Sequence, residues 1–146
     1  MTSAERGTMT TVEAASRSAG ARDWLKLLRP KHWAKNVFVL APLLFSGRAT
    51  ETAVVMDAIL VFVAFCLAAS AVYAFNDVID STEDRAHPVK RDRPVAAGRI
   101  GPGSAMAAAA LLAALSLSLA AVVVLNLLTI ALPMRWGRRK LEAMEV

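Results

Sequence analysis

The sequence predicts an all-α protein embedded in a lipid bilayer, and three observations support this fold class. Hydrophobic residues make up 56% of the 146-residue chain, whereas soluble domains usually contain about 45–50% apolar residues. These residues are concentrated in three apolar blocks separated by charged segments, which is the arrangement of a helical membrane protein. Alanine is frequent within the blocks, so helices can pack closely through small side chains.

The N-terminal part is predicted to lie outside the membrane. Residues 1–21 are small and polar and lack the apolar core of a secretory signal peptide, so we expect a disordered arm there. Residues 22–35 combine basic side chains with tryptophans, a mixture typical of the membrane interface, and Pro30 favours a break in any helix. Lys31 and Lys35 are consistent with interfacial anchoring and, equally, with binding of a substrate phosphate.

The first membrane crossing is predicted to be a helix over residues 33–49. Its apolar centre, residues 36–47, has 12 residues, whereas a helix needs about 20 to span a bilayer. The flanking residues therefore have to complete the crossing, and Pro42 is expected to kink the helix.

Two longer helices are predicted to follow. The apolar run that ends at Phe75 has Asp57 as its one charged residue and is long enough to cross a bilayer. Because no helix breaker follows it, this helix is predicted to extend over residues 53–84, before His87 and a proline end it. A loop rich in glycine and proline then leads to a third helix over residues 103–125.

The distribution of lysine and arginine predicts the orientation of the chain. The segment before the first crossing and the 85–99 loop are both strongly basic, and basic flanks favour the cytoplasmic side. We therefore expect a multi-pass protein of the cell membrane with a cytoplasmic N-terminus. The tail, residues 126–146, is also basic although it follows a third crossing, so we interpret it as an atypical end produced by a truncated or frameshifted reading frame.

The net charge of +5 does not indicate nucleic-acid binding. The basic residues flank apolar segments, where they orient the chain and attract anionic lipid headgroups. They are accompanied by no nucleic-acid-binding motif. The predicted macromolecular environment is therefore the bilayer, with no nucleic acid as a partner.

A cluster of carboxylates follows directly after the second apolar run. Asp77, Asp80 and Asp84 occur at positions i, i+3 and i+7, which on a helix lie within about 60° of one another. Such a cluster repels itself unless a cation compensates it. Oxygen ligands of this kind favour Mg²⁺, which binds a few carboxylates together with substrate phosphates. We predict Asp77, Asp80 and Asp84 as the catalytic metal ligands, with the amide oxygen of Asn76 as a further ligand to metal or ribose.

Basic and aromatic residues around this cluster complete the predicted site. Lys90, Arg91 and Arg93 are candidates for binding the phosphate groups of a substrate, although membrane anchoring explains their charge equally well. Tyr73 precedes Asp77 by one helical turn and is a candidate for lining the substrate cavity, with interfacial packing as the alternative.

The order of these residues resembles the UbiA superfamily of intramembrane polyprenyl transferases, whose first aspartate-rich motif has the pattern seen from Asn76 to Asp84. The wider context is similar to the decaprenyl-phosphate phosphoribosyltransferase branch. That likeness covers roughly residues 24–125 and rests on four segments, Arg29-Pro30-Lys31-His32-Trp33-Ala34-Lys35-Asn36, Ala41-Pro42-Leu43, Leu67-Ala68-Ala69-Ser70-Ala71-Val72-Tyr73 and the 84–98 segment with its His87-Pro88 and Arg93-Pro94 pairs.

The resemblance implies a fold and an activity. Members of this branch are bundles of about nine transmembrane helices, and the three crossings predicted here correspond to the N-terminal third. They transfer 5-phosphoribose from phosphoribosyl pyrophosphate to a polyprenyl phosphate, a step in the synthesis of cell-wall arabinan precursors. Mg²⁺ on the first aspartate motif holds the donor pyrophosphate, and a second motif on a later loop completes the site.

This chain has no counterpart of that second motif, so we expect a fragment that is inactive alone. A separately encoded C-terminal half that complements it would restore activity. Two alternatives remain, namely a fragment of a UbiA-type aromatic prenyltransferase and a small non-catalytic membrane protein that binds metal or anionic lipid.

Overall fold

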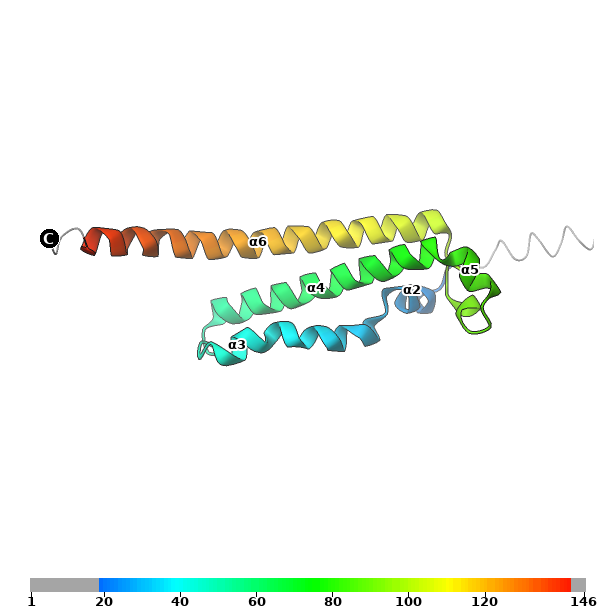
Figure 1. The fold of residues 1–146 in the computed structure, drawn as a ribbon, viewed down its shortest axis with the longest axis horizontal. Coiled ribbons are helices and arrows are strands. Elements are labelled where there is room, and N and C mark those ends of the chain that lie inside the picture. The colour runs from blue at the N-terminus through cyan, green and yellow to red at the C-terminus, as the bar shows by residue number, and fades with distance from the viewer. Residues whose placement is uncertain (1–18, 143–146) are drawn as a thin grey trace, which may run out of the picture. The chain divides into compact units, whose positions relative to one another are not determined.

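The computed structural model describes residues 19–142, with side chains described as far as residue 128, and in this part every regular element is helical (Figure 1). In chain order these elements are α2 (Ala21–Leu28), η1 (Pro30–Leu40), α3 (Ala41–Phe45), α4 (Thr52–Ile79), α5 (Ser81–Ala86), η2 (Lys90–Asp92) and α6 (Pro102–Glu142). The all-α prediction is thus confirmed for the described residues. The predicted arm over 1–21 lies almost wholly outside them.

Two helices are long and apolar enough to cross a membrane, α4 over Thr52–Ile79 and the Pro102–Leu128 part of α6. The 28 residues of α4 correspond to a length of about 42 Å, which exceeds the hydrocarbon thickness of about 30 Å. Both helices are apolar around most of their circumference, as expected of helices that face lipid on several sides. These features agree with an all-helical membrane protein.

The segment predicted as a single helix over 33–49 has a different form. It consists of the 3₁₀ helix η1 and the five-residue helix α3. The reason lies in its two prolines. Pro30 starts η1, and Pro42 occupies the first turn of α3, where a residue without an N–H is favoured at a helix start but not in a helix interior.

The helix predicted over 53–84 is divided at one residue. α4 ends at Ile79, Asp80 is a turn residue, and α5 begins at Ser81. Hydrogen bonds of the helical type nevertheless pass through the division, since the Asp80 N–H donates to the Asn76 carbonyl over 2.8 Å. The face that carries the acidic residues therefore keeps its register from α4 into α5.

The third predicted helix, 103–125, extends further in the structure, where α6 ends at Glu142. Residues 126–132, part of the predicted tail, contain no glycine or proline that would end a helix. Leucine, isoleucine and alanine in this stretch continue the apolar composition of the preceding turns.

The chain divides into two compact units, one made of the residues up to Pro30 with Ser70–Ala110 and the other of Lys31–Ala69 with the residues from Leu111 onward. In the first unit, buried apolar side chains hold α2 and the 94–100 segment against the end of α4 and the start of α6; they are Leu27, Ala74, Val95, Ile100, Ala105 and Ala109. The Ser70 hydroxyl donates to the carbonyl of Leu28, 2.8 Å away, at the end of α2.

The second unit contains polar contacts between its two long helical segments. The Asn126 amide donates to the Asp57 carboxylate over 2.8 Å, and the Ser116 hydroxyl donates to the carbonyl of Ala64 over 2.9 Å. In an apolar environment such bonds help to hold helices together.

Candidate functional site

Two carboxylates are buried in the first unit at the end of α4 and in α5. Asp77 and Asp84 are each 1% exposed, although acidic residues are almost never buried without partners. They are seven residues apart, and the helical hydrogen bonding through Asp80 keeps both on one face. Their burial therefore requires compensating positive charge within the same unit.

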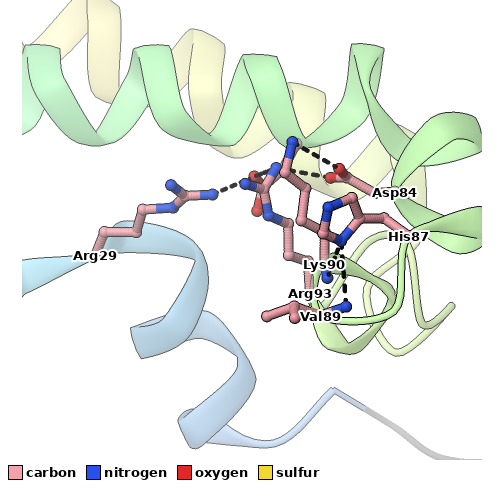
Figure 2. Close-up of polar contacts among 7 residues, drawn as sticks. Arg29, Asp84, His87, Val89, Lys90 and Arg93 are labelled. Carbon is pink, nitrogen blue, oxygen red and sulfur yellow. Dashed lines mark hydrogen bonds and ion pairs between the residues drawn. The ribbon is translucent and has the colours of Figure 1, made fainter.

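Three basic side chains supply this charge (Figure 2). One guanidinium nitrogen of Arg93 (Nη1) lies 2.7 Å from Asp84 Oδ2 and 3.4 Å from Asp77 Oδ1, so it bridges the two carboxylates. Arg29 donates to Asp77 Oδ1 from the end of α2, with 2.5 Å between the atoms. Lys90 Nζ lies 3.9 Å from Asp84 Oδ1.

One oxygen of this cluster is left without a partner. Asp77 Oδ2 is buried and, among the described residues, it is the one buried side-chain oxygen or nitrogen with no hydrogen bond. A buried carboxylate oxygen in this state loses its water without gaining another donor, which is unfavourable. It is consistent with a ligand-binding oxygen, because a bound cation would satisfy it.

The backbone of Arg29 is strained. It is the one non-glycine residue with positive φ in the described part of the chain, at φ 52° and ψ 53°, and it caps α2 directly before Pro30. A left-handed conformation at a non-glycine residue is unfavourable. Its guanidinium lies 4.8 Å from the centre of the Tyr73 ring, within the range of a cation–π interaction. In this conformation the Arg29 side chain contacts both Asp77 and Tyr73.

The loop after α5 places Arg93 and Lys90 against the acidic pair. The imidazole Nδ1 of His87 accepts hydrogen bonds from the backbone N–H groups of Val89 and Lys90, at 3.2 and 3.3 Å (Figure 2). These hydrogen bonds make His87 part of the turn that follows α5. Arg85 donates to the carbonyl of Ala96 over 3.2 Å and ties the loop back onto α5.

A second ionic cluster fastens the same loop to α2. Arg99 donates to Asp23 over 2.7 Å and to the side chain and backbone carbonyl of Asp92 over 3.1 and 2.6 Å. Lys26 pairs with Asp92 at 3.4 Å. The hydrogen bond from Arg99, together with the charge of Lys26, holds the pKa of the Asp92 carboxyl below its ordinary value.

The structure brings together five of the predicted site residues: Tyr73, Asp77, Asp84, Lys90 and Arg93. Asn76 and Arg91 are exposed, and Asp80 is half-buried at the turn between the two helices. Within the described residues no three histidine, cysteine or acidic side chains are close enough to hold a metal ion among them. Lys31 and Lys35 are exposed on η1, in the other unit.

The sequence predicted no role in the site for Arg29, Arg99 or Asp23. The position of Arg29, directly before Pro30 at the end of an amphipathic stretch, could have indicated that it lies at a helix end. The pair of Asp23 and Arg99 joins residues 76 positions apart, and no local pattern indicates such a contact.

The geometry suits binding of an anion together with a cation. Arg29, Lys90 and Arg93 offer donors that match phosphate oxygens. The two buried carboxylates, with the unpartnered oxygen of Asp77, are ligands of the type that Mg²⁺ prefers. Carboxylates at two positions and donors around them fit a magnesium–phosphate pair.

The chain is similar in sequence to several known proteins. The chain is 46% identical over 97 residues to the decaprenyl-phosphate phosphoribosyltransferase of Corynebacterium glutamicum, covering 65% of this chain and 29% of that protein. It is 46% identical over 97 residues to the protein of the same name from Mycolicibacterium smegmatis, covering 64% and 30%. It is 43% identical over 72 residues to the nodulation protein NoeC of Azorhizobium caulinodans, covering 49% and 23%.

The chain therefore spans about a third or less of the length of these relatives. No solved structure matches it significantly. Residues 37–134, which include the buried acidic pair and the loop that follows it, match the UbiA prenyltransferase family, and the chain belongs to that family.

Proposed function

We propose that this chain forms the donor-diphosphate part of a phosphoribosyltransferase of the decaprenyl-phosphate type. The observation that carries the proposal is the buried pair Asp77 and Asp84, surrounded by Arg29, Lys90 and Arg93. In the proposed reaction, an ionised phosphate oxygen of a polyprenyl phosphate attacks the anomeric carbon of phosphoribosyl pyrophosphate. The bond from that carbon to the pyrophosphate oxygen breaks, and pyrophosphate leaves with the bonding electrons.

The proposed roles follow from the chemistry of the side chains. Asp77, through its unpartnered Oδ2, and Asp84 would hold Mg²⁺, with Asp80 and Asn76 as the further ligands proposed from the sequence. Bound there, the ion supplies positive charge to the leaving diphosphate. Arg93 and Lys90 bind diphosphate oxygens through charge-assisted hydrogen bonds.

Further residues are proposed to bind substrate. Arg91 is exposed on η2 beside Lys90 and is proposed to reach outer phosphate oxygens. Lys31 and Lys35 belong to the second unit and are proposed, from the sequence alone, to bind a substrate phosphate. Tyr73, stacked on Arg29, is proposed to line the substrate cavity.

We also propose that the chain lies in the cell membrane with the acidic pair near the cytoplasmic side, so that a soluble sugar donor reaches it. The two strongly basic segments, one before the first predicted crossing and one after the second, support this orientation. Cysteine-accessibility labelling of Thr8→Cys in intact and permeabilised cells tests it. Labelling in intact cells would contradict a cytoplasmic N-terminus.

Binding of the donor tests the site. The purified chain in lipid nanodiscs is titrated with phosphoribosyl pyrophosphate and Mg²⁺ in a calorimeter, beside the Asp77→Asn and Asp80→Asn variants. We expect the unmodified chain to bind the donor. Asp77→Asn should bind it at least about tenfold more weakly, since one charged ligand is lost. Equal binding by all three chains would refute the metal role of these residues.

The same titration separates the donor classes. The UbiA prenyltransferase match favours an isoprenoid diphosphate as the second candidate donor, so geranyl diphosphate is titrated in parallel. Preference for the isoprenoid compound would replace the phosphoribosyl assignment with that of a prenyltransferase.

Turnover is tested separately. Because the chain spans about 30% of its relatives, we propose that it binds donor but transfers phosphoribose only with a complementing half. Co-expression with the remainder of the Corynebacterium glutamicum protein, followed by an assay with decaprenyl phosphate, tests this. Transfer by the chain alone would contradict the need for a complementing half.

A further inference from the structure

The buried carboxylates already have their full complement of positive charge. Asp77 and Asp84 contribute two negative charges, and Arg29 and Arg93 contribute two positive charges at hydrogen-bond distance. Lys90 adds a third positive charge at 3.9 Å. A divalent cation that entered alone would therefore join a cluster without net negative charge, close to three cations, which Coulomb repulsion disfavours.

Arg93 also occupies the position that a bridging cation needs. The same nitrogen, Nη1, lies 3.4 Å from Asp77 Oδ1 and 2.7 Å from Asp84 Oδ2. A metal ion that bridges the two carboxylates cannot occupy the space between them while this guanidinium group is there. Metal binding therefore requires Arg93 to leave at least one of the carboxylates.

Arg93 and Arg29 are placed so that they can leave. Their side chains are 26% and 22% exposed, whereas those of the two acids are at most 2% exposed. Arg29 also has the Tyr73 ring as a second partner, which keeps the guanidinium nearby when its bond to Asp77 is broken. Phosphate oxygens are strong alternative acceptors for a guanidinium, since two parallel hydrogen bonds can form.

We infer that Arg29 and Arg93 are exchangeable counter-ions, so that the cation and the diphosphate enter this site together. The inference rests on the proposed function and adds an obligatory coupling to it. The diphosphate takes over the guanidinium groups of Arg29 and Arg93, and the carboxylate oxygens that they leave become free for the cation. Neither component binds well alone, because the cation meets repulsion and the diphosphate meets donors that are already engaged.

Titrations of the 146-residue chain in nanodiscs test this with Mn²⁺, whose binding is visible by electron paramagnetic resonance. Three probes are compared: Mn²⁺ alone, inorganic pyrophosphate alone, and the preformed manganese–pyrophosphate complex. We expect the unmodified chain to bind the complex at least about tenfold more tightly than either component, a coupling of ordinary size. Because coupling is reciprocal, the metal should raise pyrophosphate affinity by the same factor.

The variant Arg93→Gln isolates the counter-ion role. Removing the bridging charge should tighten the binding of Mn²⁺ alone by about tenfold and reduce the advantage of the complex. Arg29→Gln should change both quantities in the same direction, and it provides a second measurement if Arg93→Gln fails to fold. Arg22→Gln is the matched control, since Arg22 is exposed on α2, the helix that Arg29 caps, and lies outside the ion pairs that the structure describes around the acids.

The outcomes separate this inference from the proposed function. Tight binding of Mn²⁺ alone by the unmodified chain, equal to that of the complex, would overturn the coupled entry and leave the metal-dependent donor site standing. An unchanged affinity for Mn²⁺ alone in folded Arg93→Gln and Arg29→Gln would also overturn it. Absence of metal and pyrophosphate binding in every chain would overturn the proposed function and the inference with it.

Discussion

The ion pair of Arg29 and Asp77 is expected to make a measurable contribution to the stability of the first unit. The perturbation is a double-mutant cycle of Arg29→Gln and Asp77→Asn, which removes each charge and keeps a similar side-chain volume. Such a cycle isolates the interaction between the two groups from the other consequences of each substitution.

The structure limits the size of the effect. Breaking a fully buried ion pair by removing one partner costs about 3–5 kcal/mol, but Arg29 is 22% exposed and Arg93 remains 3.4 Å from Asp77. We therefore expect Arg29→Gln to lower the free energy of unfolding by about 2–3 kcal/mol, which includes about 0.5–1 kcal/mol for the contact with Tyr73. The coupling energy of the cycle should be about 1.5 kcal/mol, near the lower limit for hydrogen bonds to charged groups.

The conformation of Arg29 gives an independent check on this reasoning. Glycine accepts a φ of 52° without the steric conflict that a Cβ atom introduces. Arg29→Gly should therefore be less destabilising than Arg29→Gln by about 1 kcal/mol, although both lose the ion pair.

The assay is unfolding by sodium dodecyl sulfate in mixed micelles, followed by the fluorescence of Trp24. This residue packs against the apolar core of the first unit, and replacing Trp33 and Trp136 by phenylalanine makes the signal specific to it. A coupling energy below about 0.5 kcal/mol would show that the pair is no stronger than an ordinary surface contact. A glycine variant less stable than the glutamine variant would refute the account of the strained cap.

Three further outcomes are expected. Asn126→Leu removes the hydrogen bond to Asp57 in the second unit and should lower the free energy of unfolding in sodium dodecyl sulfate, followed by circular dichroism, by about 0.5–1.5 kcal/mol, whereas an unchanged value would show that the bond contributes nothing. Gly98→Ala should cost about 1 kcal/mol through backbone strain alone, because Gly98 has a φ of +71° and nothing within 4 Å of an added Cβ; a neutral effect would contradict this reasoning. Since the folded pKa of Asp92 is lowered by Arg99, its contacts stabilise the loop above the ordinary carboxyl pKa of about 3.9. This stabilisation is lost as the pH falls through the folded pKa, so the protection of the η2 amides against hydrogen exchange, taken relative to their intrinsic exchange rates, should decrease there in the unmodified chain. An equal decrease in Arg99→Gln would count against the contact.

The sequence predicted the fold class and much of the site because these depend on local patterns. Apolar runs of sufficient length predict membrane helices without knowledge of their neighbours. The i, i+3, i+7 spacing of acids predicts a common helix face from periodicity alone, and Asp77 and Asp84 do lie on one buried face. The prolines also predicted where the helical structure is interrupted, although Pro42 begins a short helix here instead of kinking a long one.

The partners of those residues could not be predicted in the same way. The 85–100 loop folds back onto α2 because Val95 and Ile100 pack with Leu27 and because Arg99 reaches Asp23. These contacts join residues about 70 positions apart. Loop closure over such distances is governed by burial and charge pairing in three dimensions, which no sequence window contains.

The sequence by itself therefore determined that this is a helical membrane protein of the UbiA type with an acidic motif after its long apolar helix. The tertiary structure alone decided how the motif's charges are balanced. Asp77 and Asp84 are neutralised by Arg29 from α2 and Arg93 from the loop, with one carboxylate oxygen left over. The physical reason is that burial makes an uncompensated carboxylate unfavourable, and which cation compensates it is settled by proximity in the folded chain.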